Sequence, residues 1–366
     1  MKLAPPTIDT NYKTQLTQHP GRERRMAASF THYVLAALLF ITIAIAVSIG
    51  PTSIPLSVVV RVLLNGTGLF HFARHWDSST ELIIWNYRMP SVIGAALVGM
   101  ALSVAGALFQ GMLRNPLADP FLIGSSSGAA LGAAVAFVLP FDTVYGAFFP
   151  LTPVLAFVGA MVTVLFVYAI ARTGGQTPVV TLLLAGVVVN AVLTAFQTLI
   201  LTFAPNEEFR FRALFGWLAG SVNVVGWWSV LVVAIIVLLG CLCSLGVSHV
   251  LDVFALGEES AAHLGLHVER YKFLIIILAS LLTAAAVSIS GLIGFVGLVI
   301  PHMMRLILGP RHRGLLLSSM LSGAIFLMLA DLVSRTLSLP VGVFTALVGA
   351  PFFLFLLRRG KREYRW

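Results

Sequence analysis

The sequence predicts an all-α polytopic membrane protein. Of its 366 residues 58% are hydrophobic and 10% are charged, whereas soluble globular domains carry about 25% charged residues. The apolar residues form repeated runs of roughly 18–24 residues, each long enough to cross a hydrocarbon core as a helix. These runs lack the alternation of polar and apolar residues that is typical of membrane β-barrels. Because the bilayer core offers no water to open backbone groups, we expect the runs to be helices.

Ten helical spans account for the apolar runs. The first run follows a cluster of arginines as a signal peptide would, but it is too long and lacks a small-residue cleavage site, so we interpret it as a retained span. Residues 1–26 are then a cytoplasmic N-terminal tail, residues 27–357 the ten-helix domain and residues 358–366 a basic cytoplasmic C-terminal tail. The predicted spans are residues 27–49, 91–113, 121–139, 150–171, 179–203, 227–247, 271–290, 292–309, 315–334 and 342–357.

The basic residues predict the orientation of the chain. With both termini in the cytoplasm, the inside segments hold 17 of the 23 lysines and arginines, as the positive-inside rule requires. The same placement beside apolar runs explains the net charge of +9 without nucleic acid as a partner. Two sizeable segments, residues 50–87 and 204–226, lie outside in this topology, and each contains a stretch suited to a short surface helix.

A polar island at residues 251–270 interrupts the apolar sequence. It carries four carboxylates and two histidines, so we expect it to lie in water, on the cytoplasmic side. Its apolar residues recur near helical spacing, and two glycines stand where a short helix would begin and end. These residues are Leu256, Ala261, Ala262 and Leu264, with Gly257 and Gly265. The island is either a handle for a soluble partner or a plain connecting helix.

A polar seam marks the fifth predicted span. Asn190, Thr194 and Gln197 follow one another at i, i+4 and i+7, with Gly186 on the same stripe. Such a stripe is costly against lipid, so it faces other helices or a water-filled path. Pore lining and hydrogen bonding between helices both fit this pattern.

Three kinds of chemical site are not indicated. There is no G-x-x-x-x-G-K-[ST] motif, so an ATPase that drives transport would be another chain. Cys241 and Cys243 point to different faces of a helix, which indicates neither a disulfide framework nor a metal site. The run Gly124-Ser125-Ser126-Ser127-Gly128 matches the letters of a hydrolase nucleophile elbow, but it opens a helical span without a nearby histidine. Helix packing and N-capping by serine explain this run better.

Charged residues near the outer ends of spans have two interpretations. Asp331 and Arg335 lie at i, i+4 in the ninth span, where they can neutralise each other, or Arg335 can offer its charge to an outside partner. Arg88, just before Pro90, is typical of an interfacial anchor. His302 is expected to be packed or hydrogen-bonded rather than a ligand.

A weak internal repeat is visible in the spacing of small residues and proline. Ser103-x-x-Gly106 is followed ten residues later by Pro116, and Ser288-x-x-Gly291 is followed ten residues later by Pro301. The topology sends the two spans in opposite directions, so the repeat would be inverted, as is common in transporters.

Several motifs in a fixed order resemble the FecCD-type permease family. The resemblance covers nearly everything from about residue 80 to 357. The motifs are Arg88-Met89-Pro90, Gly106-x-x-x-Gln110-x-x-x-Arg114-Asn115-Pro116-Leu117-Ala118-Asp119-Pro120, Gly124-x-Ser126-x-Gly128, Leu256-Gly257-Glu258 with Leu264-Gly265, Gly294-Phe295-x-Gly297-Leu298-x-x-Pro301-His302-x-x-Arg305, Ala330-Asp331 and Pro340-x-Gly342-x-x-Thr345-x-x-x-Gly349-x-Pro351.

The resemblance implies a type II ABC importer permease of the bacterial inner membrane. Such a subunit pairs with a second copy, two cytoplasmic ATPases and one external binding protein. It carries no cofactor and no metal site, because ATP and Mg²⁺ are bound by the partner ATPase, and it is not itself an enzyme. Its substrate would be a bulky metal chelate, with ferric siderophore as the first expectation and haem or vitamin B12 as alternatives.

The resemblance also assigns roles to residues. The cytoplasmic loop at 251–270, with Leu256, Gly257, Glu258, Ala262, Leu264 and Gly265, would dock into the ATPase. External docking of the binding protein would use Arg88 and Arg335, although the family's second arginine is Ser91 here. The loop Asn115-Pro116-Leu117 and Thr177 would form the cytoplasmic gate. The fifth and tenth spans would line the path, which favours pore lining for Asn190, Thr194 and Gln197.

Two other functional classes make distinct predictions. A secondary transporter should carry ionisable residues in mid-membrane, and only Asp331 comes close. An intramembrane serine hydrolase would lose its activity on substitution of Ser126.

Overall fold

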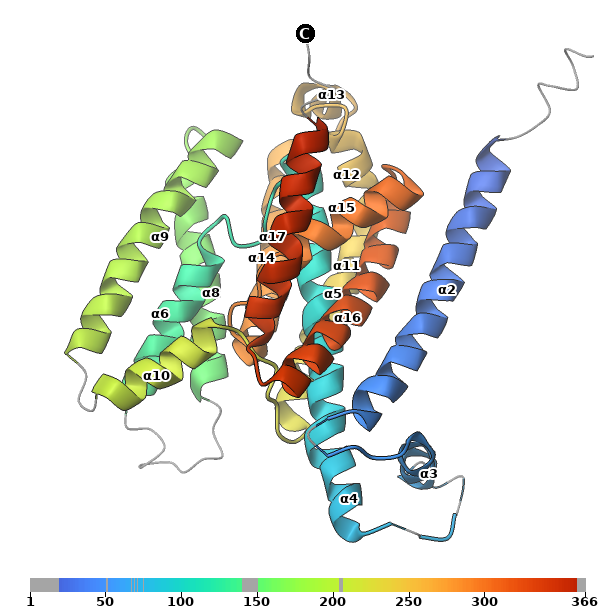
Figure 1. Cartoon of the computed structure of the whole chain (residues 1–366). Coiled ribbons are helices and arrows are strands. Elements are labelled where there is room, and N and C mark those ends of the chain that lie inside the picture. The colour runs from blue at the N-terminus through green and yellow to red at the C-terminus, as the bar shows by residue number, and fades with distance from the viewer. Residues whose placement is uncertain are drawn as a thin grey trace, which may run out of the picture.

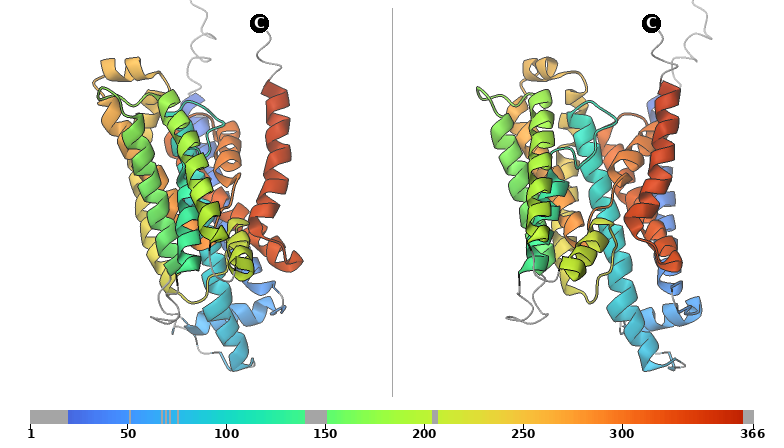
Figure 2. Two further views of the ribbon diagram at one scale, coloured as in Figure 1. Left: turned by 90° about the vertical axis from the view of Figure 1, so that its left-hand side faces the viewer. Right: turned by 60° about the vertical axis from the view of Figure 1, so that its left-hand side comes forward.

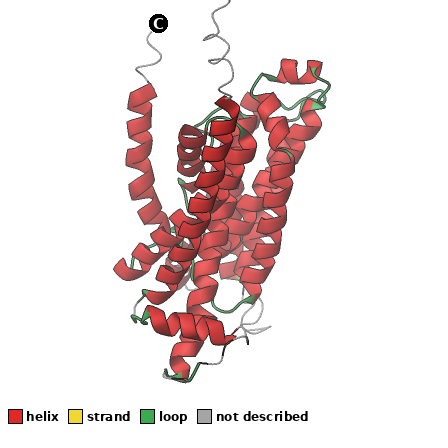
Figure 3. Cartoon of the chain, turned by 90° about the vertical axis from the view of Figure 1, so that its right-hand side faces the viewer, coloured by secondary structure: helices red, strands yellow, loops and turns green. Residues whose placement is uncertain are grey.

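The computed structural model describes residues 20–50, 52–66, 68, 70, 72–74, 76–139, 151–203 and 207–360. Over these residues the chain is a bundle of α-helices (Figure 3), and the pairing of Thr173 with Gln176 is an isolated β-bridge. Most of the predicted N-terminal tail, the last six residues and the predicted start of the fourth span at 150 lie outside the described residues. The all-helical prediction is therefore confirmed for the part that can be described.

Among the described residues, seven helices are long and apolar enough to cross a membrane. The first is α2 (Pro20–Ser48), which begins well before the predicted residue 27 and makes part of the predicted tail helical. The second is a continuous helical segment made of α4 (Ser78–Leu82), the π-helical η1 (Ile83–Arg88) and α5 (Met89–Met112). The others are α8 (Leu151–Ala171), α9 (Val179–Thr202), α11 (Trp228–Gly246), α14 (Val268–Ser290) and α16 (His312–Leu337).

Three further predicted spans coincide with shorter apolar helices. These are α6 (Ser125–Val138), α15 (Val296–Leu308) and the apolar part of α17 (Val341–Gly360). The 14 residues of α6 reach only about 21 Å at 1.5 Å per residue, less than a hydrocarbon core of about 30 Å. Residues 121–124 and 292–295, predicted as helix, are irregular because Gly124 (φ 88°) and Phe295 (φ 68°) adopt the left-handed conformation.

The core of the bundle is organised around α5. In the most apolar 18-residue stretch of this helical segment, 89% of the residues are buried within the chain. The helices α16, α14, α15 and α11 surround α5 (Figure 1). Glycines bring these helices into backbone contact: a side chain on Gly99 would collide with the carbonyl of Gly323 in α16, and one on Gly106 with that of Gly297 in α15. The predicted role of small residues in helix packing is confirmed at these positions.

The two ends of the bundle carry different short helices. One end holds α12 (Ser248–Phe254), α13 (Glu258–His263) and the end of α17. The opposite end holds α3 (Leu56–Gly66), α4 and α10 (Glu207–Leu218), as Figures 1 and 2 show. The surface helices predicted within residues 50–87 and 204–226 correspond to α3 and α10.

The inverted repeat is matched in direction but not in local structure. Figure 1 shows α5 running toward the end that carries α13, whereas α14 runs away from it. Pro116 lies in the loop after α5, while Pro301 lies inside α15. The repeat therefore stays a prediction.

Candidate functional site

The polar island folds into two short helices joined by a tight turn. Gly257, with φ 108°, ends the turn after α12, and α13 starts at the next residue. Gly265, with φ 86°, follows α13 and leads to α14. Only glycine adopts these backbone angles without strain. The prediction of a short helix between these two glycines is confirmed.

The apolar residues of this coupling loop, residues 251–270, point in two directions. Ala261 is fully buried and holds α13 against the bundle, whereas Ala262 is exposed. Leu256 and Leu264 are each 65% exposed. The docking role that the family resemblance implies for these two leucines stays a prediction.

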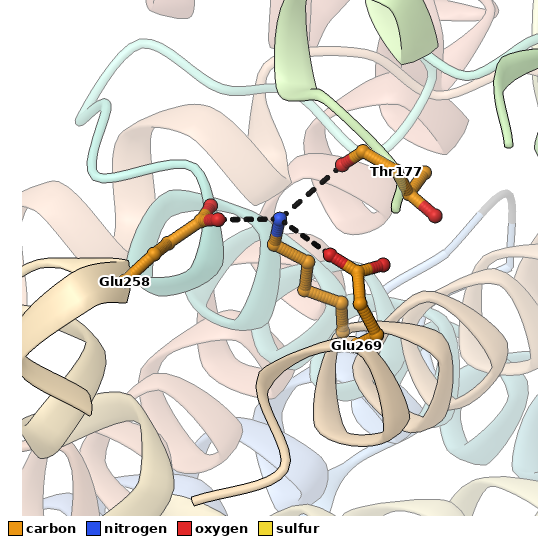
Figure 4. Close-up of polar contacts among 4 residues, drawn as sticks. Thr177, Glu258 and Glu269 are labelled. Carbon is orange, nitrogen blue, oxygen red and sulfur yellow. Dashed lines mark hydrogen bonds and ion pairs between the residues drawn. The ribbon is translucent and has the colours of Figure 1, made fainter. Parts of the chain in front are cut away.

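A buried lysine ties the coupling loop to the bundle. Lys272, in the first turns of α14, is 4% exposed. Figure 4 shows its Nζ between three oxygen atoms: Glu258 Oε2 at 2.6 Å, Glu269 Oε1 at 3.2 Å and the carbonyl oxygen of Thr177 at 3.2 Å. An ammonium group has three N–H donors, so these contacts use all of them.

The predicted gate loop lies next to the same coupling loop. A Cβ on Gly257 would lie 3.5 Å from a guanidinium nitrogen of Arg114, the residue immediately before Asn115. Asn115 Oδ1 accepts a hydrogen bond from Leu117 N at 2.9 Å, which shapes the tight turn. Its own N–H donates to the carbonyl of Gln110 at 3.2 Å.

The gate loop also packs against the last helix. Pro116 and Leu117 line a small space of about 10 Å³ together with Leu298, Val299 and His302 of α15 and Phe352 and Phe353 of α17. This space is water-sized, so the loop, α15 and α17 are in close contact. Both the predicted constriction and its gating role stay predictions.

Thr177, the second predicted gate residue, lies elsewhere. It is 1% exposed, and its carbonyl accepts from Lys272 just before Pro178, the N-cap of α9. The coupling loop thus lies beside Arg114, the residue before the 115–117 loop, and Lys272 links its Glu258 to Thr177 before the start of α9.

The polar seam of α9 serves two environments. Asn190 accepts a hydrogen bond from Ser127 Oγ of α6, so this residue forms the bond between helices that was one of the two predictions. Thr194 is exposed and donates to the carbonyl of Asn190 at 2.8 Å, a local bond that leaves its outer surface open. Asn190 and Thr194 therefore have different roles in this structure.

Gln197 lines a cleft of about 480 Å³ between α9 and α10. Thr198 and Thr202 of α9 face it, with Glu208 and Phe211 of α10 on the other side. The cleft is both polar and apolar, and it lies at the end opposite α13. In the corresponding 18-residue apolar stretch of α9, only 17% of the residues are buried within the chain.

Arg88 is an internal anchor in this structure. It is 5% exposed, and its guanidinium donates to the carbonyls of Val47 at 2.8 Å and Ser48 at 3.0 Å, and to Thr52. These bonds tie the end of α2 to η1, and the interfacial-anchor interpretation stays a prediction. The docking role implied by the family resemblance stays a prediction, and the buried guanidinium does not favour it.

Arg335 forms the predicted ion pair. Its guanidinium lies 2.8 Å from Asp331 Oδ2, and its side chain is 17% exposed. Arg335 also lies close enough to Arg88 to interact with it electrostatically. The two arginines thus lie near each other where η1 meets α5 and where α16 ends.

The serine-rich run at the start of α6 is structural. Ser125 donates to the carbonyl of Pro120 at 3.1 Å, and Ser127 Oγ, which donates to Asn190, also lies 3.1 Å from the carbonyl oxygen of Gly124. No serine side chain caps the helix, because the N-cap residue is Gly124. The N-capping prediction is therefore wrong. Across the described ranges, no group of three or more histidine, cysteine or carboxylate residues is placed to hold a metal ion, and Cys241 and Cys243 are free thiols.

Two features of the site were missed by sequence reasoning. Lys272 was counted only as a topology-setting cation, although a lysine three residues after Glu269 at the start of an apolar span signals a local ion pair. Asp252 Oδ1 accepts from both the backbone N–H of His312 at 2.9 Å and its ring Nδ1 at 2.8 Å, which joins α12 to the start of α16. Nothing in the sequence pairs these two residues.

Comparison with known proteins agrees with this geometry. The sequence profile described as the FecCD transport family matches residues 38–359. The chain is 43% identical over 289 residues to the cobalamin import system permease protein BtuC of Halobacterium salinarum, covering 78% of this chain and 76% of that protein. It is 38% identical over 310 residues to the hemin transport system permease protein HmuU of Yersinia pestis, covering 80% and 89%.

A solved structure shows the same fold. It is described as an inward-facing conformation of a metal-chelate type ABC transporter, and it aligns with a TM-score of 0.76 and 30% identity over 90% of this chain and 98% of that chain. The relatives are permease subunits rather than enzymes, and this chain is likewise a membrane-spanning permease. The resemblance carried by the motifs is thereby confirmed, and the chain belongs to the FecCD transport family.

Proposed function

We propose that this chain is the permease subunit of an ABC importer that moves a bulky metal chelate into the cell. The observation that supports it most is the coupling loop: Leu256 and Leu264 stand exposed for a partner, while the same loop reaches both Arg114 beside the gate loop and Thr177 at the start of α9. A loop that only connected two spans would not need either feature.

The driving force then comes from outside the chain. Separate ATPase subunits, which bind ATP and Mg²⁺, grip Leu256, Ala262 and Leu264 from the cytoplasm. This places the α13 end, together with both termini, on the inside, as the basic residues predict. The orientation also makes the α3 and α10 end the face for the external binding protein, where Arg335 is the more exposed of the two docking arginines.

The transport path lies along the exposed face of α9. Its apolar residues and Thr194 are exposed within one chain, so a second copy is the partner that completes the walls. The tenth predicted span, α17, lines the other side of the path. A wide lining with few polar groups suits a bulky substrate, since a site that binds too well cannot release it.

The class of substrate is a metal chelate of the size of haem or cobalamin. Relatives of this chain carry names for cobalamin, hemin, iron chelatin and ferric citrate import. Ferric siderophore remains our first proposal within this class, with haem and cobalamin as the alternatives.

Reconstitution tests the function directly. The permease is placed in proteoliposomes with its ATPase and binding protein, and uptake of radiolabelled cobalamin, haem and a ferric siderophore is measured with ATP and with a non-hydrolysable analogue. We expect uptake of one chelate with ATP only. Uptake by the permease alone, driven by an ion gradient, would instead support a secondary transporter, and activity lost on Ser126→Ala would support a hydrolase.

A further inference from the structure

We infer that Lys272 is a positioning residue that transmits movement of the coupling loop to the start of α9. The inference rests on the proposed function, because it names the internal link through which an ATPase would act on the path helix. It starts from the position of the ammonium group, which touches three separate segments of the chain: α13, α14 and the turn before α9.

The first step concerns burial. The Lys272 side chain is 5% exposed, whereas Glu258 and Glu269 are 37% and 29% exposed. A buried ammonium group has no water to replace a lost partner, so its position follows the partners that it has. The two carboxylates on the rim can exchange with water more readily. The lysine therefore moves with its partners.

The second step concerns direction. Glu258 is the first residue of α13, next to the exposed Leu256, so any partner that shifts the coupling loop shifts this carboxylate. Its contact with Lys272 Nζ, at 2.6 Å, is the shortest of the three. The carbonyl of Thr177 is held by the same Nζ, and α9 begins two residues later at Val179. A displacement of Glu258 Oε2 would therefore be transmitted to the Thr177 carbonyl oxygen through Lys272 Nζ, which contacts both.

The third step concerns what is free to move. The turn at 173–178 connects α8 to α9, and only 17% of the apolar window of α9 is buried within the chain. Much of the surface of α9 is thus free of other parts of the chain, as Val180 (67% exposed) and Leu184 (61% exposed) show, and the bond from Lys272 ties the residue before its N-cap to α14. By contrast, 72% of the residues in the apolar 18-residue stretch of α14 are buried, so the helix that carries Lys272 is held firmly in the bundle.

The experiment compares Lys272→Met with wild type in the reconstituted complex. Methionine keeps the length and the packing of the side chain but removes the three donors. We expect ATP hydrolysis to stay within about twofold of wild type, because Leu256 and Leu264 are unchanged, while chelate moved per ATP falls about tenfold, as expected when one coupling contact is lost. Lys272→Arg should restore the ratio, and Arg270→Met, an exposed neighbour, is the matched control. An unchanged ratio in Lys272→Met overturns the inference.

A second readout separates this inference from the proposed function. Spin labels are placed at Ser260 in α13 and Val180 in α9, in a background with Cys241→Ala and Cys243→Ala, and their distance is measured in the permease alone. Lys272→Met should broaden the distance distribution, and Lys272→Arg should not. If wild type shows no ATP-dependent uptake, the proposed function fails, and the distance measurement still decides the inference: superposable distributions overturn it. Should Lys272→Met not fold, Glu258→Ala removes the α13 acceptor alone and is expected to broaden the same distribution.

Discussion

The half of the bundle around α5 and the half that carries α9 are built in opposite ways. In the apolar 18-residue stretch of α5, 89% of the residues are buried, and α5 contacts α16 and α15 through glycine backbones. In that of α9 only 17% are buried, and valine, leucine and phenylalanine side chains are exposed along most of the helix. The first half has the packing of a finished core. The second is a surface that needs another chain, lipid or a path beside it.

This difference teaches how one chain can be both stable and mobile. Close backbone contacts resist relative motion, because the helices cannot slide without overlap. A helix held by few internal contacts can shift at little cost. The coupling loop is attached to both halves, through Asp252 to α16 and through Lys272 to α9, so it can use one half as a support while it moves the other.

The largest expected effect breaks the packed half. Gly106→Val places a side chain against the carbonyl of Gly297, so α5 and α15 must separate. We expect either no monodisperse permease or a melting temperature lower by about 10 °C, the consequence of severe overpacking. Gly216→Ala in α10, where no atom lies within 4 Å of the added carbon, is the control and should melt as wild type does. A Gly106→Val variant that melts at the wild-type temperature would show that the backbones of Gly106 and Gly297 are not in close contact.

The next effect concerns the coupling loop that joins the halves. Leu256→Asp with Leu264→Asp should weaken ATPase binding by about 100-fold or more, because each leucine buried in an interface contributes about 1.5–3 kcal/mol. The melting temperature of the permease alone should not change, since both side chains are 65% exposed. Binding is measured by titrating labelled ATPase onto permease in nanodiscs. Leu256→Met with Leu264→Met should bind normally; equal affinity of the aspartate variant would remove the docking role.

A smaller effect sharpens the description of the exposed half. In a background with Cys241→Ala and Cys243→Ala, Thr194→Cys in α9 should react with a charged, membrane-impermeant thiol reagent about tenfold faster than Leu239→Cys in α11, because a thiolate forms only in contact with water. Both positions are exposed within one chain, Leu239 by 58%. Similar slow rates would place Thr194 against lipid or protein rather than along a path.

The smallest effect is a pH dependence at the loop before α6. Burial raises the pKa of the Asp119 carboxyl above its usual value, and the hydrogen bond from Phe121 N–H opposes this only in part. A raised pKa means that the fold favours the neutral acid, so this stabilisation is present at low pH and is lost as pH rises through the folded-state pKa. Asp119→Asn, which keeps an acceptor for Phe121, should therefore raise the melting temperature by about 1–2 °C at pH 7.5.

The control for this prediction is pH itself. The difference between Asp119→Asn and wild type should vanish below pH of about 4, where an ordinary aspartate is protonated. A difference that is constant from acid to neutral pH would mean that the substitution acts through packing and not through charge.

Much of the fold could be predicted because its signals are local. Long apolar runs define most helices to within a few residues, and Gly257 and Gly265 bound α13 because their backbone angles are a local requirement. The shortness of α6 and α15 escaped prediction, since Gly124 and Phe295 adopt left-handed angles that depend on what packs around them. An irregular backbone at such depth is tolerated only when protein surrounds it.

The candidate site was predictable where a motif marks it and not where distant residues meet. The short helix between Gly257 and Gly265 was marked by the sequence and is present. Lys272 and Thr177 are 95 positions apart in the chain, and Asn190 finds Ser127 across 63 positions. Such contacts are decided by the tertiary fold. Within the polar seam, Asn190 contacts another helix while Thr194 is exposed, and their spacing in the sequence does not reveal this difference.

The most direct test measures whether the two halves move apart under ATP. Spin labels at Val187 in α9 and Leu239 in α11 report on motion between the halves, and labels at Leu239 and Leu317 in α16 report on motion within the packed half. In the complete complex we predict that ATP changes the first distance and leaves the second unchanged, and that Leu256→Asp with Leu264→Asp abolishes the change. A first distance that ignores ATP, or one that responds equally without the two leucines, would contradict the account.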